Sequence, residues 1–290
     1  MTRRWSWLGP LVLVAACGHH ASRPEPPRRP VEPAPSATPE DRKPQRSRYQ
    51  QERDSAPGAR PDIANIPEPV PRAEPKSAYG NQSPYTVLGQ TYKVLDSCKG
   101  YSERGIASWY GNKFHGHLTS NRESYDMYQF SAAHKTLPLP CYVRVTNLEN
   151  GRSVVVRVND RGPFFETRVI DLSYVAAIKL GIDGHGTGLV EVRALDPAHL
   201  EAAPPERVVA ARKAALYLQV GAFADPDNAR RLQARLGQEG IAKVGIDPVE
   251  REGRRLHRVR IGPLASVDEA DALEARLKRM GVTSISVNVD

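Results

Sequence analysis

Five titratable residues in the middle of the chain could carry out acid–base chemistry: Glu123, Asp126, His134, Asp160 and Asp171. A carboxyl group that protonates a leaving oxygen must hold its proton near neutral pH, and burial raises the pKa of a carboxyl group in that direction. Asp171 follows an apolar run that is typical of a strand, so we expect its carboxyl group to be partly desolvated. Asp171 is therefore the predicted proton donor, and Glu123 is its rival.

Glu123 and Asp126 follow a polar stretch, which places both residues on or beside a loop. The alternative for such a pair is a solvated turn without a catalytic role. Arg122 would lower the pKa of Glu123 if the two side chains are close. In that case Glu123 is better suited to stabilising positive charge than to donating a proton.

Two interpretations stay open for each of the other candidates. His134 lies next to apolar neighbours, where it is either a structural hydrogen-bond donor or a group that holds Asp126 or Glu123 in the required protonation state. Asp160 stands beside Arg161 and before a Gly-Pro turn, so it either holds that turn or takes part in catalysis.

Two other chemistries fit the sequence poorly. His115 and His117 could form a zinc site with His134, but histidines in a glycine-rich surface stretch are usually unliganded, and we predict no metal and no cofactor. A serine hydrolase with a strained nucleophile turn needs a Gly-x-Ser-x-Gly motif, and the sequence contains none.

The elements that must position these residues are mostly short strands. Asn150-Gly151 is a strong hairpin turn between two β-rich runs, and one helix is expected from Ser173 to Leu180, ended by Gly181. Short strands with a single helix predict a compact β-barrel rather than a parallel α/β sheet. The β-rich runs are Ile106–Tyr110, Tyr142–Thr146, Ser153–Val158 and Leu189–Ala194.

The N-terminus has the features of a lipoprotein signal peptide. Arg3 and Arg4 precede an apolar run from Trp5 to Ala16, which is too short to span ~30 Å of hydrocarbon. The small residues before Cys17 resemble a bacterial lipobox, which implies lipidation of that cysteine and attachment to a membrane. Gly18 stands where many lipoproteins retained at the inner membrane have aspartate, so we expect the periplasmic face of the outer membrane.

A proline-rich stretch follows the signal. Of the 25 prolines, 15 lie between Arg23 and Pro84, with almost no periodic apolar residues, which predicts a disordered or polyproline-like linker over 18–84. The net charge of +8 would suit nucleic acid. The arginines form no dense basic run, however, and the export signal points away from nucleic acid, so we predict no such partner.

Two cysteines remain besides Cys17. Cys98 and Cys141 lie in a chain predicted to enter a compartment that permits disulfides. They either pair, linking the segment before the first domain to a barrel strand, or stay as two unpaired residues.

Residues 214–290 contain a weak internal repeat of strand, helix and strand. The β-rich runs are 216–223 and 256–264, and the helices are expected over 226–240 and 267–280. Ser266, with Glu269 three residues later, is a good N-cap for the second helix. The predicted order of elements is βαββαβ.

Several motifs occur in order in the first folded region, among them Gly105-Ile-Ala-Ser-Trp-Tyr-Gly, Ala132-Ala-His-Lys-Thr-Leu-Pro and Val158-Asn-Asp-Arg-Gly-Pro-Phe. They resemble the rare lipoprotein A family, which implies a double-psi β-barrel that acts as a lytic transglycosylase. In that reaction the C6 hydroxyl of muramic acid attacks its own anomeric carbon and leaves a 1,6-anhydro ring.

The resemblance also bears on the site residues. It places Glu123 and Asp126 on a functional motif, and the Asp-Leu-Ser context of Asp171 is similar to the acid position of expansins and related endoglucanases. Arg122 and Cys141 depart from the family pattern, which commonly has a glycine and a small polar residue there.

The C-terminal repeat, with its Val220-Gly-Ala-Phe and Ile261-Gly-Pro-Leu units, resembles a sporulation-related repeat (SPOR) domain. The resemblance implies binding to glycan strands stripped of stem peptides, as found at division septa. The alternative is that Phe223 is a core residue and the arginines only solvate a sheet face. The candidate sugar contacts are Gln219, Phe223, Arg258 and Arg260.

The sequence therefore predicts a double-psi β-barrel followed by a small α+β domain. Such a chain is expected to cut the bonds between muramic acid and glucosamine units of peptidoglycan at the septal ring, with division proteins as further partners. The alternative is a non-catalytic septal lipoprotein that binds peptidoglycan. The predicted segments are a signal peptide (1–17), a linker (18–84), the barrel (85–198), a second linker (199–213) and the SPOR domain (214–290).

Overall fold

A computed structural model describes residues 54–165, 167–198, 214–251 and 253–290. The predicted signal peptide with Cys17, the predicted linker up to residue 53 and the predicted linker over 199–213 lie outside the described residues. Among the described residues, none of the helices combines the length and the apolar character that crossing a membrane requires.

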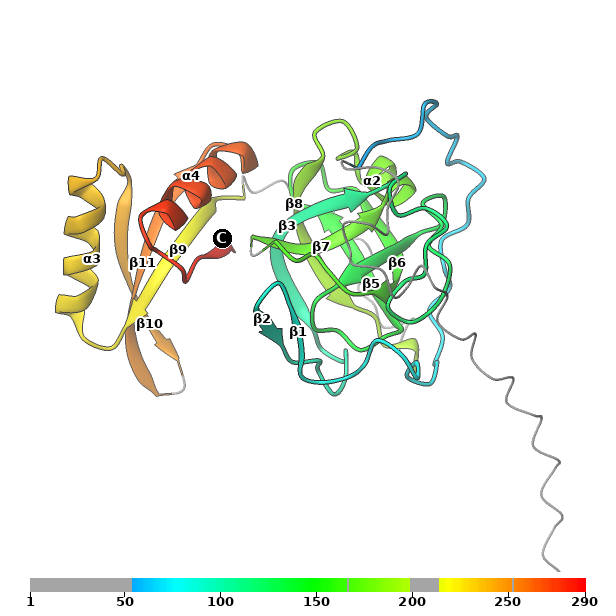
Figure 1. Cartoon of the computed structure of the whole chain (residues 1–290), viewed down its shortest axis with the longest axis horizontal. Helices are drawn as coiled ribbons and strands as arrows, with labels where there is room; N and C mark the ends of the chain where they lie inside the picture. The colour runs from blue at the N-terminus through cyan, green and yellow to red at the C-terminus, as the bar shows by residue number, and fades with distance from the viewer. Residues whose placement is uncertain (1–53, 166, 199–213, 252) are drawn as a thin grey trace, which may run out of the picture. The chain divides into compact units, whose positions relative to one another are not determined.

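Six strands close into a barrel in the order β3-β7-β4-β6-β5-β8 (Figure 1). Two neighbouring pairs, β3 with β7 and β4 with β6, run parallel, and the other pairs are antiparallel. This closed barrel confirms the predicted architecture. Its strands are β3 (Ser102–Tyr110), β4 (Ser131–His134), β5 (Cys141–Asn147), β6 (Ser153–Asp160), β7 (Arg168–Ser173) and β8 (Thr187–Ala194).

The alternation of residues along the strands explains why they close around an apolar interior. Every second residue of β6 from Val154 to Val158 is a valine with at most 1% of its surface exposed, because successive side chains of a strand point to opposite faces. The predicted turn at Asn150-Gly151 joins β5 to β6. The predicted helix, α2 (Tyr174–Leu180), ends as expected at Gly181, whose φ of 75° suits glycine.

Residues 54–84, which we name the N-terminal strap, lie against the barrel (the blue trace in Figure 1). Asp54 accepts hydrogen bonds from the backbone N–H groups of Gly111 (2.7 Å) and Lys113 (3.0 Å), and Glu68 accepts one from that of Val155 (2.7 Å). The predicted boundary between linker and barrel at residue 85 is therefore wrong for this stretch. Its side chains find partners on the barrel although its proline content prevents regular elements.

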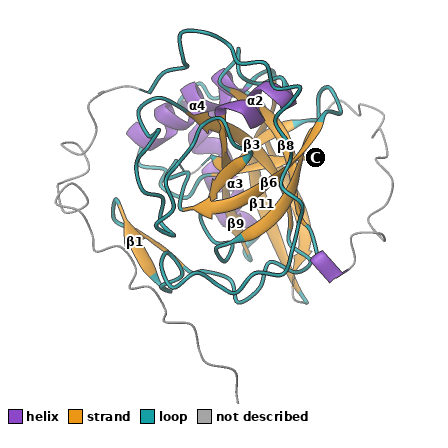
Figure 2. Ribbon diagram, turned by 90° about the vertical axis from the view of Figure 1, so that its right-hand side faces the viewer, coloured by secondary structure: helices purple, strands orange, loops and turns teal. Residues whose placement is uncertain are grey.

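A short hairpin follows the strap. Its strands, β1 (Tyr85–Val87) and β2 (Gln90–Tyr92), pair with each other and form a sheet of their own. The β1 strand stands apart from the barrel strands in Figure 2. Tyr85 ties the hairpin to the barrel, because its hydroxyl group donates a hydrogen bond of 2.7 Å to the carbonyl oxygen of Lys135.

The C-terminal domain has the predicted βαββαβ order. Its four strands form one antiparallel sheet in the order β10-β11-β9-β12. Leu236 of α3 and Leu277 of α4 are fully buried in one core with Leu218 and Ile261 of the sheet, so both helices cover the same face. The elements are β9 (Leu216–Phe223), α3 (Pro226–Gln238), β10 (Val244–Arg251), β11 (Arg254–Leu264), α4 (Val267–Arg279) and β12 (Ser286–Val289).

Both predicted capping residues of α4 are confirmed. The hydroxyl group of Ser266 accepts a hydrogen bond of 3.1 Å from the backbone N–H of Glu269, and the Glu269 carboxylate accepts one from the backbone N–H of Ala265. Each bond satisfies a backbone donor at the helix terminus, which is the energetic basis of the capping box.

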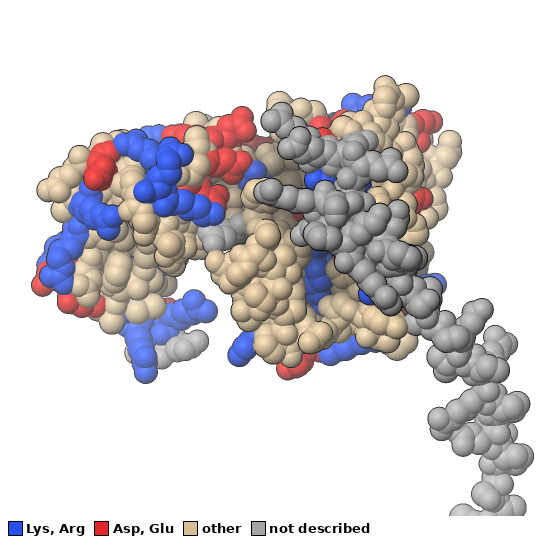
Figure 3. Space-filling view, in the orientation of Figure 1, with Lys and Arg blue, Asp and Glu red and all other residues tan. Residues whose placement is uncertain are grey.

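Charged side chains of both signs are mixed on the face drawn in Figure 3, where Lys and Arg alternate with Asp and Glu. The mixture agrees with the scattered arginines of the sequence, whose net charge is +8.

Candidate active site

The strand register brings two of the predicted acids into one row across the barrel. Asp160 on β6 pairs with Ala133 on β4, Ala133 pairs with Asp171 on β7, and Asp171 pairs with Ser108 on β3. Neighbouring strands lie ~4.8 Å apart, so the backbones at Asp160 and Asp171 are about 10 Å apart. The four residues form the floor of the candidate site.

Asp171 has the properties of a general acid. Its neighbours Ile170 and Leu172 are fully buried, whereas Asp171 itself remains partly exposed. Burial raises the pKa of Asp171 to about 6, and the hydrogen bond that the Ser108 hydroxyl group donates to its Oδ1 partly opposes this rise. The backbone passes close by at Gly162, where an added Cβ atom would lie 3.6 Å from Asp171 Oδ2. About half of Asp171 is therefore protonated at pH 6 and about a tenth at pH 7, far more than for an ordinary aspartate.

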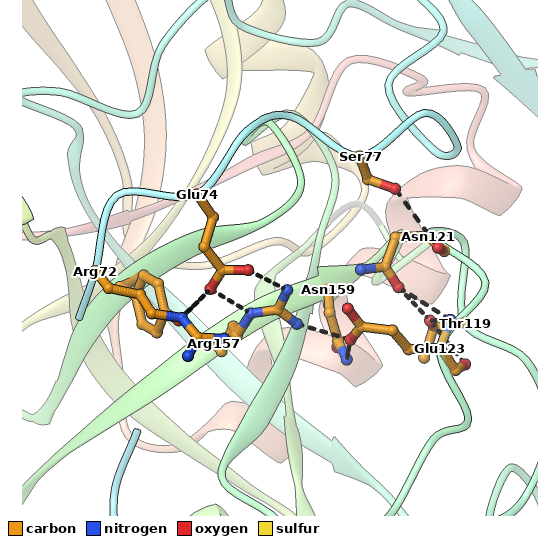
Figure 4. Close-up of polar contacts among 9 residues, drawn as sticks. Arg72, Glu74, Ser77, Thr119, Asn121, Glu123, Arg157 and Asn159 are labelled. Carbon is orange, nitrogen blue, oxygen red and sulfur yellow. Dashed lines mark hydrogen bonds and ion pairs between the residues drawn. The ribbon is translucent and has the colours of Figure 1, made fainter. Parts of the chain in front are cut away.

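Glu123 is held in the ionised form. Its Oε2 accepts hydrogen bonds from Arg157 Nη1 (2.7 Å) and Asn159 Nδ2 (2.9 Å), as Figure 4 shows. Burial alone would raise the pKa of Glu123, but these two donors outweigh burial and leave the pKa below its ordinary value. The structure therefore favours a charge-stabilising role for Glu123 over proton donation.

The cation beside Glu123 is not the one we expected. Arg122 stacks over the ring of Tyr79, 5.5 Å from its centroid, and Arg157 is the residue that binds the Glu123 carboxylate. Arg122 has a φ of 72°, in the left-handed region that glycine adopts most easily. This left-handed conformation explains why the family pattern commonly has a glycine at position 122.

Asp160 holds a turn. Its Oδ1 accepts hydrogen bonds from the backbone N–H of Ser120 (2.8 Å), the hydroxyl group of Ser120 (2.6 Å) and the backbone N–H of Arg161 (2.7 Å). Of the two interpretations left open for Asp160, these contacts favour the structural one. Through Ser120 it fixes the loop that also carries Glu123.

His134 is buried in the barrel wall. Its Nδ1 accepts hydrogen bonds from the backbone N–H groups of Thr136 (3.1 Å) and Leu137 (3.0 Å), and its Nε2 lies 2.8 Å from the hydroxyl group of Tyr101. Burial lowers the pKa of His134 to about 3, so the imidazole is neutral. These contacts favour the structural interpretation, since none of them is to Asp126 or Glu123.

Asp126 lies beside a different histidine. Its Oδ1 accepts a hydrogen bond of 2.9 Å from the backbone N–H of Tyr128 and lies 3.7 Å from His115 Nδ1. The structure thus separates the predicted pair, since Glu123 binds Arg157 and Asp126 neighbours His115. In the described ranges, no three His, Cys, Asp or Glu side chains gather as metal ligands would.

Sequence reasoning missed the group that supports Glu123. Arg157 lies between two carboxylates, with Glu123 on one side and Glu74 of the strap on the other (Figure 4). Glu74 binds the guanidinium through both oxygens, at 3.1 Å from Nε and 2.9 Å from Nη2. A charged residue amid the valines of β6 was a signal for Arg157, but nothing in the local pattern indicated Glu74.

Replacing Glu74 with glutamine is expected to lower the free energy of unfolding by about 1.5–3 kcal/mol at pH 7, the range for hydrogen bonds to a charged group. The hydrogen bond from Arg157 lowers the pKa of Glu74 from 4.5 to about 2. The stabilisation is therefore fully present above pH ~4.5 and is lost as the pH falls through about 2. Urea unfolding of both proteins at several pH values measures the difference.

Arg72 provides the control for this comparison. It also pairs with Glu74, at 3.3 Å, but 74% of its side chain is exposed against 19% for Arg157. Arg72→Ala should therefore change the stability by less than about 1 kcal/mol. If Glu74→Gln and Arg72→Ala lowered the free energy of unfolding by the same amount, the pairing of Glu74 with Arg157 would contribute nothing to stability.

The predicted sugar contacts of the C-terminal domain lie on two faces of its sheet. Gln219 pairs directly with Arg260, on the face opposite to the buried Leu218 and Ile261. A bulge between Val259 and Arg260 shifts the register. Phe223 consequently packs against the core beneath the helices, as the alternative stated.

Tyr217 is the aromatic residue on the open face. The guanidinium of Arg260 lies 4.3 Å from the centroid of the Tyr217 ring and is also paired with Asp247 and Asp290. Arg258, two residues before Arg260, pairs with Ala222 of β9 and is partly buried. The sequence analysis missed Tyr217 because it named Phe223, the aromatic residue of the Val220-Gly-Ala-Phe unit, as the sugar contact.

Cys98 and Cys141 are neighbours in the structure. Both are free thiols, and a hydrogen bond between them lowers the pKa of Cys98 and raises that of Cys141. Cys98 also packs against the barrel core that contains Cys141. Their pairing as a disulfide stays a prediction.

Taken together, the barrel residues offer a carboxyl group with a raised pKa at Asp171 and an ionised carboxylate at Glu123. The end of β6, which carries Asn159 and Asp160, lies between them. A proton donor with a separate negative charge is the combination that cleavage of a glycosidic bond requires, because the transition state resembles an oxocarbenium ion.

Comparisons with known proteins agree with this assignment. A family model described as "Lytic transglycolase" matches residues 102–193, and a model of the SPOR domain matches 213–288. The chain is 44% identical over 262 residues to the "Endolytic peptidoglycan transglycosylase RlpA" of Pseudomonas aeruginosa strain UCBPP-PA14, covering 72% of this chain and 76% of that protein. It is 52% identical over 148 residues to the protein of the same name from Vibrio cholerae, covering 51% and 56% of the two chains.

A solved structure is also similar to the C-terminal domain. It is the crystal structure of the RlpA SPOR domain from Pseudomonas aeruginosa, which is 41% identical. The match covers 25% of this chain and 96% of that chain, with a TM-score of 0.24.

Proposed function

Since the chain belongs to the RlpA family of endolytic peptidoglycan transglycosylases, we propose that its barrel cleaves glycan strands with Asp171 as the proton donor. Burial raises the pKa of both carboxyl groups in the row across β6, β4, β7 and β3, and the pKa of Asp171 reaches about 6. The observation that carries the assignment is that Asp171 accepts one side-chain hydrogen bond, from Ser108, whereas Asp160 Oδ1 is engaged by Ser120 and by the backbone N–H of Arg161. Glu123 supplies the negative charge that the developing oxocarbenium ion needs.

The reaction needs one proton shuttle. Asp171 donates its proton to the bridging oxygen as the bond between that oxygen and the anomeric carbon of muramic acid breaks. The C6 hydroxyl oxygen of the same sugar then bonds to the anomeric carbon, and its proton returns to the Asp171 carboxylate. The products are a 1,6-anhydromuramic acid end on one fragment of the strand and a free hydroxyl group on the glucosamine that ends the other fragment, and Asp171 is ready for the next cycle.

Mass spectrometry provides the direct test. The full chain is incubated with purified glycan strands, either intact or stripped of stem peptides, and the products are searched for 1,6-anhydro ends. We expect such ends in both digests and faster release from the stripped strands. Hydrolysed reducing ends in place of anhydro ends would contradict the proposed mechanism.

The pH dependence should report the titration of Asp171. The general acid must be protonated, so kcat/KM should fall as the pH rises through about 6, the pKa of Asp171. Ser108→Ala removes a hydrogen bond that lowers this pKa, so the falling limb should move to higher pH. A limb that stays in place in Ser108→Ala would argue against Asp171 as the titrating group.

The remaining parts of the chain suit a septal lipoprotein. Cys17 would carry the lipid that anchors the protein to the periplasmic face of the outer membrane. The open face of the C-terminal sheet, with Tyr217, Gln219 and Arg260, would bind glycan strands that lack stem peptides and concentrate the enzyme at the division septum. Division proteins would be further partners at that location.

A further inference from the structure

A cavity of about 400 Å³ lies beside the candidate active site. Its walls come from two parts of the chain that are distant in sequence: the end of the strap with the β1–β2 hairpin, and the turn from Arg161 to Phe164 that follows β6. Sites for small molecules commonly have volumes of ~300–1,000 Å³. The cavity therefore has room for a sugar ring.

Aromatic rings line one side of this cavity. Phe164 lies 6.0 Å from Tyr92, and Tyr92 stacks on Tyr85 at 5.4 Å, measured between ring centroids. The guanidinium of Arg161 completes the row, 5.7 Å from the centroid of Tyr85. Phe164 and Tyr85 both border the cavity, so the row offers an aromatic surface to the apolar face of a sugar.

Two polar side chains, those of Arg161 and Gln82, also border the cavity. Arg161 is held rigidly by hydrogen bonds to the carbonyl oxygens of Gly80 (2.8 Å) and His134 (3.1 Å) and to Asn81 Oδ1 (3.2 Å). The exposed amide of Gln82 lies at the rim. A further hydrogen bond to the carbonyl oxygen of Leu137 means that four of the five N–H groups of Arg161 are used within the protein. The remaining Nη2 N–H and the amide of Gln82 can donate hydrogen bonds to the carboxylate, hydroxyl or acetamido groups of an aminosugar.

The cavity is also connected to the proton donor. Ser120 borders it and bonds to Asp160, which stands in the same row as Asp171. The turn between Arg161 and Phe164 contains Gly162, whose backbone passes beside the Asp171 carboxyl group. A glycan strand with one sugar in the cavity would thus continue along this turn toward Asp171.

We propose that this cavity is a binding subsite for an aminosugar of the glycan strand, positioned by the aromatic row and Arg161. The inference rests on the proposed function and adds to it the part of the chain that holds the strand. It also assigns a role to the β1–β2 hairpin, which lies outside the barrel.

Two adjacent phenylalanines allow a matched test in the full chain. Phe164 borders the cavity, whereas the side chain of Phe165 is 76% exposed and does not. Phe164→Ala should raise KM for stripped glycan strands about tenfold with little change in kcat, as expected for the loss of one aromatic contact made equally in ground and transition state. Phe165→Ala should stay within about twofold of wild type. Gln82→Ala, a change at an exposed position, should raise KM in the same direction as Phe164→Ala.

An NMR titration separates failure of this inference from failure of the proposed function. A tetrasaccharide of alternating glucosamine and muramic acid is added to the full chain, and the backbone amide shifts of Ser120 and Arg161 are followed. Shifts at these residues without any anhydro product would support the subsite and overturn the proposed activity. Anhydro product without such shifts, and with equal KM for Phe164→Ala and Phe165→Ala, would overturn the subsite alone.

Discussion

Replacing Asp171 with asparagine is expected to slow the formation of 1,6-anhydro ends by about 10²–10⁴-fold, the usual contribution of a general acid. Asparagine has nearly the same volume and keeps an oxygen that can accept the hydrogen bond from Ser108. It has no acidic proton to give to the bridging oxygen. The loss should appear in kcat, because the interaction matters only while the glycosidic bond breaks.

Two measurements show whether the loss comes from chemistry alone. The thermal unfolding midpoint and the affinity for glycan strands should both match those of the wild type, since Asp171 is not placed in the C-terminal domain and the substitution preserves shape. A variant that retains more than a tenth of the activity would move the proton donor to another group. An inactive variant that has also lost its fold would be replaced by Asp171→Glu, which keeps the acid but displaces it.

Replacing Glu123 with glutamine should have the second largest effect, a fall in kcat of about 10²–10³-fold. This is the range observed when a preorganised electrostatic contact to the transition state is removed. Glutamine retains an acceptor for Arg157 and Asn159, so the loop should stay in place. What disappears is the negative charge, and with it the stabilisation of the oxocarbenium-like centre.

The pH profile gives Glu123→Gln a signature that a structural role would not produce. In the wild type, kcat/KM should fall at low pH as Glu123 becomes protonated, at a pH below the ordinary pKa of glutamate because its two donors favour the ionised form. Glu123→Gln should lack this acidic limb and keep the limb that Asp171 causes. Glu149→Gln, at an exposed position before the Asn150-Gly151 turn, is the matched control and should leave both limbs unchanged.

The sequence predicted the strands whose residues are β-branched, because alternating valines can bury one side of each strand only in a sheet. The pattern of β6 is an example, and so is the single helix ended by Gly181. Strand β4, Ser131-Ala-Ala-His, was not predicted. Its alanines have little preference for strands, and their place in the barrel depends on parallel pairing with β6, a distant contact that local sequence does not contain.

The residues of the candidate site also differ in whether the local sequence predicts them. Asp171 could be found from its position directly after the apolar residues Val169 and Ile170, because a carboxyl group in such a strand is partly desolvated and its pKa rises. The group that supports Glu123 could not be found, because Arg157 binds Glu123 from a distant strand and is itself held by Glu74 of the strap. Phe223 was misplaced for a similar reason, since the bulge at Val220 of β9 decides which face of the sheet its side chain occupies.

The attachment of the strap to the barrel also limits how far the enzyme can work from its anchor. If Cys17 carries the lipid, a tether over 18–84 would contain 67 residues and could extend at most ~240 Å, whereas a tether that ends at residue 53 contains 36 residues and could extend at most ~130 Å. Docking of the strap on the barrel from Asp54 onward thus nearly halves the maximum radius around the anchor. Weakening the contacts of Asp54, Glu68 and Glu74 together would lengthen that radius and let the same catalyst reach deeper layers of the wall.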